Sequence, residues 1–154
     1  MEENEVTTED KTESKPGIRV FVYGSLKRGH GNNWLLDHGG AEFLGLCLLS
    51  GKHKLVDLGY YPGLVPDHSP NAPEQTVLGE VWRVDKDTLD ALDQLEGHPD
   101  YYARCKVQTP WKGAWAYYLP TDYLARAPLV PTLGDAGPQV WRPSPEEVAY
   151  ASAA

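Results

Sequence analysis

The alternation of apolar and polar residues along the chain predicts several β-strands. The predicted strands are rich in β-branched and aromatic residues and cover residues 18–23, 41–49, 52–58, 76–84, 101–109 and 113–119. A turn is predicted at residues 59–63, and a short helix around 34–36 with Asn32 or Asn33 as its cap. Strands and helices do not alternate strictly, as they would in a doubly wound sheet. The pattern therefore predicts an α+β domain in which a small, mixed β-sheet curls into a barrel with few helices.

The clearest predicted helix begins after Asp85 and ends at Gly97. Asp85 is a residue type that caps helix starts, and glycine commonly ends helices. The predicted apolar stripe consists of Leu89, Leu92 and Leu95. Asp90 and Asp93 are expected to give the helix its solvent-facing side.

Charge and proline content divide the chain of 154 residues into three parts around one domain. Residues 1–17 are predicted to be a disordered acidic tail, because residues 1–15 alone carry −4 of the net charge of −8 and no aromatic residue. Residues 18–126 are the predicted folded domain, and residues 127–154 a proline-rich C-terminal extension. Prolines at 128, 131, 138, 143 and 145 argue against regular structure in most of this extension. It is either a lid over a site or an inert tail.

Charge, hydropathy and cysteine content argue against several classes of function. The domain without its tail is only mildly acidic, which disfavours a nucleic-acid partner. The longest near-apolar stretch, residues 43–49, is too short to span a bilayer, so we expect no membrane partner. Two cysteines and an acidic start without an apolar run are typical of a reduced, cytoplasmic protein.

Neither the histidines nor the cysteines indicate a metal site. The five histidines have no paired i, i+4 spacing and no accompanying cysteine pair. Cys105 lies between two basic residues, but a strand cysteine is usually inert. We therefore expect no metal, no other cofactor and no cysteine nucleophile.

Glu96 occupies a position on its predicted helix where an apolar residue is expected. On a helical wheel it lies between Leu89 and Leu92, within the buried stripe. Burial and the negative end of the helix dipole both disfavour its anion, so we expect a raised pKa, which suits a general acid and base near neutrality. Alternatively, Glu96 extends into solvent at a frayed helix end or pairs with Arg104. Helix geometry alone leaves both interpretations open.

The segment Tyr23-Gly24-Ser25-Leu26-Lys27-Arg28-Gly29 follows directly on the first predicted strand. A glycine at a strand end lets the backbone turn sharply, so that successive N–H groups can converge on an anion such as a carboxylate. Lys27 or Arg28 would add positive potential. The segment is neither a P-loop nor a Gly-x-Ser-x-Gly elbow, because the required glycines are missing. An ordinary turn with two solvated cations is the alternative.

Three patches of the chain together resemble the γ-glutamylcyclotransferase family, which includes the γ-glutamylamine cyclotransferases of its AIG2-like branch. They are Val20-Phe21-Val22-Tyr23-Gly24-Ser25-Leu26-Lys27-Arg28-Gly29, then Tyr61-Pro62-Gly63-Leu64, and then Leu92-Asp93-Gln94-Leu95-Glu96-Gly97-His98-Pro99 with Tyr102-Ala103-Arg104. The resemblance covers about residues 18–119. Each patch alone is a weak signal, and their order and spacing make the set specific.

The resemblance implies a fold, a reaction and a set of site residues. It implies the γ-glutamylcyclotransferase-like fold and release of 5-oxoproline and a free amine from a γ-glutamyl amine or amide by intramolecular aminolysis. Glu96 would be the general acid/base, and loop amides would hold the α-carboxylate of the substrate. The implied substrate-binding residues are Tyr23, Gly24, Ser25, Leu26, Tyr102 and Tyr117. Arg104 would be structural or would tune nearby charge. The implied partner is a small γ-glutamyl molecule, with no metal or cofactor.

One departure from the family pattern concerns the leaving group. Relatives that act on γ-glutamylamines often have Pro-Asn-His after the loop glycine, where this chain has Gly31-Asn32-Asn33. The sequence therefore predicts neither the leaving amine nor an oligomeric state. A non-catalytic protein that binds a γ-glutamyl or similar small acid on the same fold is the alternative function. An inward-facing carboxylate at Glu96 favours the enzyme, because a pure sensor does not need it.

Overall fold

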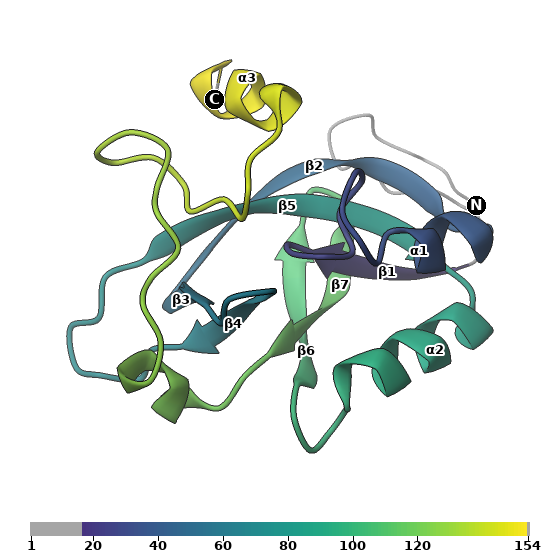
Figure 1. Ribbon diagram of the computed structural model, residues 1–154, viewed down its shortest axis with the longest axis horizontal. Coiled ribbons are helices and arrows are strands. Elements are labelled where there is room, and N and C mark those ends of the chain that lie inside the picture. The colour runs from purple at the N-terminus through teal and green to yellow at the C-terminus, as the bar shows by residue number, and fades with distance from the viewer. Residues whose placement is uncertain (1–16, 154) are drawn as a thin grey trace, which may run out of the picture.

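The computed structural model describes residues 17–153, which form one curled β-sheet with helices at its margins (Figure 1). The strands are β1 Ile18–Val22, β2 Glu42–Gly51, β3 His53–Asp57, β4 Pro62–Pro66, β5 Gln75–Val84, β6 Ala103–Thr109 and β7 Lys112–Tyr118. The helices are α1 Trp34–His38, α2 Lys86–Glu96, α3 Pro145–Ala153 and the 3₁₀ helix η1 Thr121–Ala125. Apart from Gly17, the predicted disordered tail lies outside the described residues.

The sheet is mixed, as predicted, and its strand order is β2-β5-β1-β7-β4-β3, with β6 paired to β7. Most neighbours are antiparallel, whereas β7 runs parallel to both β1 and β4. Strand β5 pairs with β2 along its whole length and with β1 along its second half. Every residue from 77 to 84 is buried, on both faces of this strand. The curl of the sheet brings the end of β1, at Val22, close to β4 and β7.

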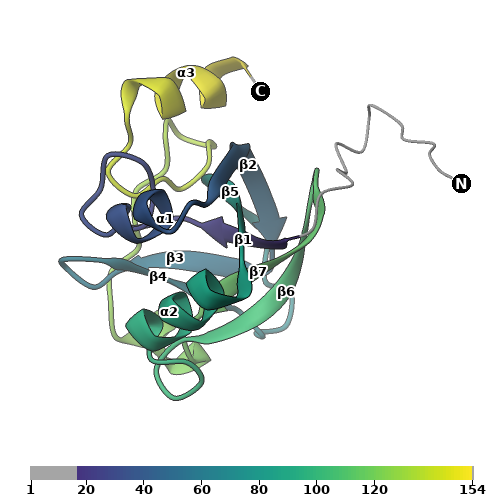
Figure 2. The same ribbon diagram turned by 90° about the vertical axis from the view of Figure 1, so that its right-hand side faces the viewer.

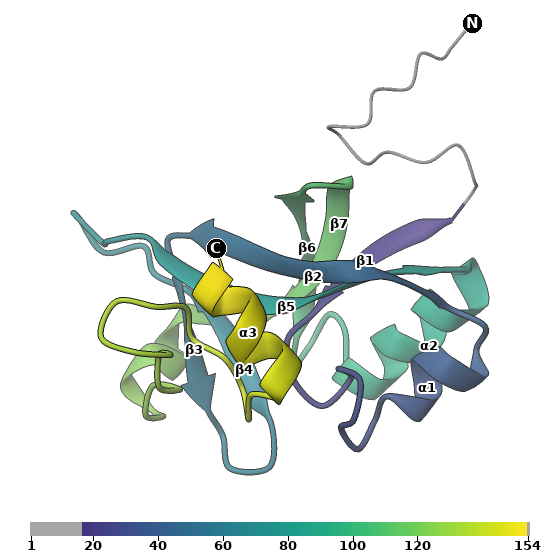
Figure 3. The same cartoon turned by 90° about the horizontal axis from the view of Figure 1, so that it is seen from above.

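The helices lie on two sides of the sheet. Helices α1 and α2 pack together, and α3 lies on the opposite side of the molecule from α2 (Figure 2). Seen from above, α1 and α2 lie at one end and α3 lies across the other end of the long strands β2 and β5 (Figure 3). No helix within residues 17–153 is long and apolar enough to cross a membrane.

Helix α2 begins as predicted, and its apolar stripe is shorter than predicted. The Asp85 carboxylate accepts a hydrogen bond from the Thr88 main-chain N–H at 2.7 Å, which caps the helix start. Leu89 and Leu92 are buried, but Leu95 is 44% exposed. The prediction for Leu95 was wrong because the last turn of α2 borders an open pocket instead of the core.

The end of α2 is fixed by Gly97 in the left-handed conformation, with φ of 68°. The Gly97 N–H donates to the Gln94 carbonyl and the His98 N–H donates to the Asp93 carbonyl, which is a Schellman motif. A side chain at position 97 would be strained at this φ. The last turn of the helix, which carries Glu96, therefore has a defined end rather than a frayed one.

Three elements were not predicted, namely β4, α3 and the short helix η1. Strand β4 occupies residues expected to be part of a turn and beyond it, and the prolines at both its ends concealed it. Helix α3 lies in the extension in which prolines were expected to prevent regular structure. Pro145 is the first residue of α3, where a helix tolerates proline because that N–H has no partner inside the helix.

The C-terminal extension packs into the core of the domain through Gln139. Its main chain pairs with β5: the Gln139 N–H donates to the Thr76 carbonyl at 2.9 Å, and the Leu78 N–H donates to the Gln139 carbonyl at 3.1 Å. Its buried side chain accepts from the Leu55 N–H at 2.7 Å and donates to the Leu55 carbonyl at 2.9 Å and the Val130 carbonyl at 2.7 Å. The extension therefore supplies a partner to two strands of the sheet.

Candidate active site

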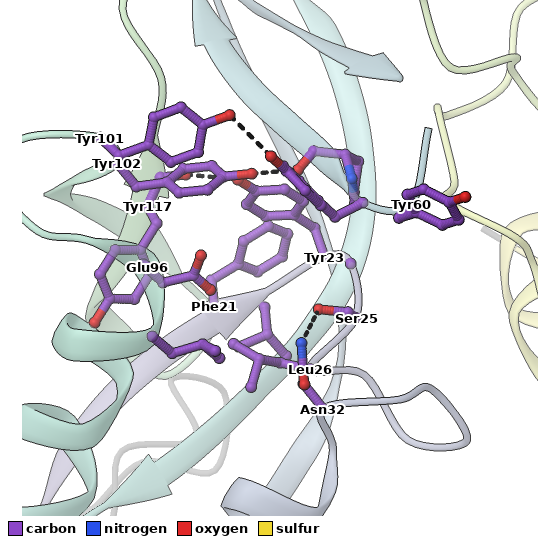
Figure 4. A pocket seen from close by; sticks show the side chains of 15 residues that line it. Phe21, Tyr23, Ser25, Leu26, Asn32, Tyr60, Glu96, Tyr101, Tyr102 and Tyr117 are labelled. Atoms are coloured by element: carbon purple, nitrogen blue, oxygen red, sulfur yellow. Dashed lines mark hydrogen bonds between the residues drawn. The ribbon is translucent and has the colours of Figure 1, made fainter. Parts of the chain in front are cut away.

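A pocket of about 360 Å³ opens where the end of β1, the β3–β4 turn, the end of α2 and β7 meet (Figure 4). Every site residue named from the sequence lines it, namely Tyr23, Gly24, Ser25, Leu26, Glu96, Tyr102 and Tyr117. Eight lining residues were not named, namely Phe21, Val22, Asn32, Tyr60, Tyr61, Pro62, Leu95 and Tyr101. Among these lining residues, Glu96 carries the only charged side chain. The structure brings the named residues together, and their chemical roles stay predictions.

The Glu96 carboxyl group points from the last turn of α2 into the pocket (Figure 4). It is partly buried, and burial raises its pKa from 4.5 to about 7. No described residue forms an ion pair with it, because the Arg104 guanidinium pairs with Asp93 instead. The raised pKa expected from the sequence is present, and the alternative of a Glu96–Arg104 pair does not occur.

Asp93 was expected to face solvent, and this prediction was wrong. It is partly buried, and its Oδ1 accepts hydrogen bonds from Arg104 Nε at 2.9 Å and from the Tyr117 hydroxyl at 2.6 Å. Burial acts to raise the pKa of Asp93, but these two hydrogen bonds outweigh it and hold the pKa below its ordinary value. Asp93 therefore joins the end of α2 to β6 and β7, one turn before Glu96.

Three tyrosines form the walls of the pocket with hydroxyls that are already engaged. Tyr23 donates to the Tyr117 main-chain carbonyl at 2.7 Å. Tyr102 donates to the Pro62 carbonyl at 2.7 Å, and Tyr117 donates to Asp93. Burial raises the pKa of all three above the usual range, so they are neutral near pH 7. These hydroxyls orient the walls and have no proton left for a substrate.

The loop after β1 presents three main-chain N–H groups that make no hydrogen bond to any described residue. They belong to Gly24, Ser25 and Leu26. The loop turns back on itself because the Lys27 N–H donates to the Gly24 carbonyl at 3.0 Å. A Cβ at position 24 would lie 2.7 Å from the Pro62 ring, so only glycine allows this approach. Successive unpaired main-chain donors of this kind can bind an anion.

Lys27 and Arg28 do not add free positive potential to the pocket, and that expectation was wrong. The Lys27 ammonium is fully buried and donates to the Trp141 carbonyl and to Glu147. Arg28 pairs with Glu80 on β5 and with Glu146 on α3. Both side chains are paired with glutamates outside the pocket, so binding of a carboxylate in the pocket would rely on the loop amides.

The side chains of Asn32 and Asn33 were predicted to cap α1, but they bind the loop after β1 instead. Asn32 Nδ2 donates to Ser25 Oγ at 2.9 Å, and Asn33 Nδ2 donates to the Leu26 carbonyl at 2.8 Å. Asn33 occupies the N-cap position but makes no side-chain cap. The two asparagines therefore hold the Gly24–Leu26 loop in its observed shape.

Other candidate chemistry lies outside the pocket. Cys105 is exposed on β6 and is not a lining residue. Within residues 17–153, no group of three or more histidine, cysteine, aspartate or glutamate side chains is arranged to hold a metal ion.

Comparison with known proteins places this site in a family. A family model described as "Gamma-glutamyl cyclotransferase, AIG2-like" matches residues 20–135. The chain belongs to this family. Among its members, the γ-glutamylcyclotransferase family protein YtfP of Escherichia coli K12 is 42% identical over 101 residues, which cover 65% of this chain and 80% of YtfP.

Two further members of the γ-glutamylcyclotransferase family come from vertebrates. The γ-glutamylaminecyclotransferase A of Danio rerio is 38% identical over 96 residues, covering 59% of this chain and 58% of the zebrafish protein. The crystal structure of a mouse AIG2-like protein matches with a TM-score of 0.62 and 28% identity, over 85% of this chain and 99% of that one. The curled mixed sheet is thus the family fold that the sequence predicted.

Proposed function

We propose that this protein is a γ-glutamylcyclotransferase that releases 5-oxoproline and a free amine from a γ-glutamyl amine or amide. The observation that carries the proposal is the pairing of two features across one pocket. On one side lies Glu96, whose pKa is raised to about 7 (Figure 4). The loop that lines the other side carries the free amides of Gly24, Ser25 and Leu26. Membership of the family supports the same reaction class.

The nucleophile in this reaction belongs to the substrate. The α-amine of the glutamyl group attacks its own γ-carbonyl carbon, and closure gives a five-membered ring. The protein has to hold the folded conformer, because proximity of the two groups supplies much of the rate enhancement. The loop amides of Gly24, Ser25 and Leu26 would fix the α-carboxylate, which leaves the α-amine directed toward Glu96.

Glu96 would move the proton twice. Its carboxylate accepts a proton from the α-ammonium as the new C–N bond forms. The resulting carboxylic acid then donates that proton to the leaving nitrogen as the old C–N bond breaks, which regenerates the carboxylate. The attacking nitrogen has to lose a second proton to become the lactam N–H, and this proton passes to the departing amine, which leaves as an ammonium ion, or to solvent. A pKa near 7 suits both steps.

The oxyanion that forms at the γ-carbonyl needs a donor other than the wall tyrosines, since their hydroxyls already donate to protein atoms. The Asn32 side-chain amide lines the pocket and donates one of its two N–H groups to Ser25 Oγ, so its second N–H would supply a donor separate from the loop amides that hold the α-carboxylate. A donor that another hydrogen bond already holds in place stabilises charge without reorganisation during the reaction.

The proposal is tested by incubating the protein with γ-glutamyl-ε-lysine, γ-glutamyl-alanine and glutathione. We expect 5-oxoproline from at least one of them, measured by mass spectrometry, in wild-type protein and not in Glu96→Gln. Saturable binding of these compounds without any product would contradict the enzyme and favour the non-catalytic binding protein. The compound that is turned over fastest identifies the class of leaving amine.

A further inference from the structure

Lys27 connects the carboxylate-binding loop to the C-terminal extension. Its main-chain N–H closes the loop on Gly24, and its side chain runs away from the pocket. The ammonium group is fully buried and donates to the Trp141 carbonyl at 2.7 Å and to Glu147 Oε2 at 2.8 Å. Lys27 therefore closes the turn with its main chain and connects the turn to the C-terminal extension with its side chain.

The local sequence fixes the Glu147 carboxylate for this contact. Ser144 and Glu147 form a capping box at the start of α3: Glu147 Oε1 accepts from the Ser144 N–H at 2.9 Å, and the Glu147 N–H donates to Ser144 Oγ at 3.1 Å. The second carboxylate oxygen, Oε2, is left for Lys27. The acceptor is therefore held in place before the lysine contacts it.

Residues 139–147, which include Trp141 and Glu147, also contact other parts of the fold. At the start of this stretch, Gln139 forms hydrogen bonds with β5 and β3. Arg142 donates to the Gly59 carbonyl at 3.2 Å, next to Tyr60 in the turn that forms the opposite rim. Residues 139–147 thus contact Lys27 and Gly59, the chain neighbours of two pocket-lining residues, and all of them lie beyond the stretch matched by the family model, which ends at residue 135.

We propose that Lys27 and Glu147 are positioning residues, through which the C-terminal extension holds the Gly24–Leu26 amides in the geometry that receives the α-carboxylate. This inference rests on the proposed function. A buried ion pair contributes little net stability compared with an apolar pair of similar volume, so stability alone does not account for it. The carboxylate of the substrate is bound equally in the ground state and the transition state. Displaced amides therefore raise KM and leave kcat unchanged.

The experiment compares wild type with the double variant Lys27→Met/Glu147→Gln. Methionine keeps the apolar stem, and glutamine keeps an oxygen for the Ser144 cap, so no lone charge is left buried. With the panel compound that wild type turns over fastest, we expect KM to rise about tenfold, kcat to stay within about twofold and the pH dependence of kcat to be unchanged. The dissociation constant of that compound, measured by calorimetry in a Glu96→Gln background, should rise by the same factor.

A matched control removes an exposed ion pair instead. Lys86 and Asp90 pair at 2.7 Å on the outer face of α2, and Lys86→Met/Asp90→Asn should leave both kinetic constants unchanged. If Lys27→Met/Glu147→Gln does not fold, Glu147→Gln alone, which keeps the cap, should still raise KM.

The outcomes separate the two proposals. A folded double variant with wild-type KM and dissociation constant would overturn the positioning role, while wild-type turnover would leave the proposed function standing. Absence of turnover of every panel compound by wild-type protein would overturn both.

Discussion

Glu96 has to be ionised to accept a proton, yet its surroundings favour the neutral acid. The apolar and aromatic groups around it raise its pKa to about 7, and no described cation opposes them. Aspartate and glutamate side chains that are tuned in this way by burial are frequent at catalytic positions. The proposed acid/base role of Glu96 can be tested directly by substitution.

Replacement of Glu96 by glutamine keeps the shape of the side chain and removes proton transfer. We expect kcat of Glu96→Gln to fall by about 10²–10⁴-fold, because general acid–base catalysis contributes on that order. The dissociation constant of the substrate should change little, since the loop amides are untouched. Steady-state kinetics and calorimetry measure the two quantities. Asp90→Asn, on the exposed face of the same helix, is the control and should retain wild-type kcat.

The pH dependence of kcat/KM should report the ionisation of Glu96 in the free enzyme. Activity should rise with pH and level off above an apparent pKa of about 7, because only the carboxylate accepts the first proton. Initial rates measured between about pH 5 and about pH 9 would show this limb. A limb near the ordinary carboxyl pKa of 4.5 would contradict burial as the source of the shift.

The same pKa shift predicts how stability depends on pH. The pKa is higher in the folded state, so the folded state binds the proton more tightly and loses relative stability as pH rises from 4.5 through about 7. At full ionisation the penalty is about 3 kcal/mol for a shift of this size. Glu96→Gln should therefore be more stable than wild type at about pH 8 and equal to it near pH 4. Urea unfolding at both pH values measures the difference, and equal stability at the higher pH would contradict it.

At the scale of elements, the end of α2 is fixed by one carboxylate that contacts two strands. Asp93→Ala removes the acceptor for Arg104 on β6 and for the Tyr117 hydroxyl on β7. We expect the free energy of unfolding to fall by about 2 kcal/mol, because both donors lose a partner in a partly buried site. Urea denaturation measures this loss, and Asp90→Ala should stay within about 0.5 kcal/mol of wild type. A comparably small effect at Asp93 would show that the three groups do not act together.

Helix α2 was predicted at both ends, whereas β4 and α3 were missed. The ends of α2 depend on Asp85 and Gly97, and these act within a few residues of themselves. Strand β4 depends on its antiparallel partner β3 and on contact with β7 near the end of the sheet, which local pattern does not contain. For α3 a local signal existed in Ser144 and Glu147, and the density of prolines around them obscured it.

At the scale of the whole molecule, the C-terminal extension supplies hydrogen-bond partners that the sheet cannot replace. Gln139→Ala would leave the Leu55 N–H and the Val130 carbonyl buried without partners, while the Leu55 carbonyl would keep only the Val130 N–H. We expect a loss of about 2–4 kcal/mol in the free energy of unfolding. Chemical denaturation measures this, with Gln108→Ala on the exposed face of β6 as the control. A loss within about 0.5 kcal/mol would show that the extension is dispensable to the fold.

The site residues could be predicted from the sequence only where they lie in a local sequence motif. The loop after β1 and the end of α2 carry recognisable patterns, and the structure places them on one pocket. Tyr60, Tyr61 and Tyr101 reach the pocket because the sheet curls and brings two turns together, which no local pattern encodes. The Lys27 side chain was wrongly expected to add positive charge to the pocket, because the contact that holds it elsewhere is also long-range. Its partner, Glu147, lies 120 residues further along the chain.

The division of the pocket between main chain and side chains has a consequence for how its specificity can evolve. A backbone N–H survives every substitution except proline, so the proposed recognition of the glutamyl head group would withstand most point mutations at Ser25 and Leu26, whereas position 24 has to stay glycine beside Pro62. The mouth, by contrast, is made of exposed side chains at Tyr60, Tyr61, Leu95 and Tyr101, which can be exchanged without disturbing that turn. Descendants of this gene could therefore acquire new leaving groups while the chemistry on the glutamyl half is inherited intact.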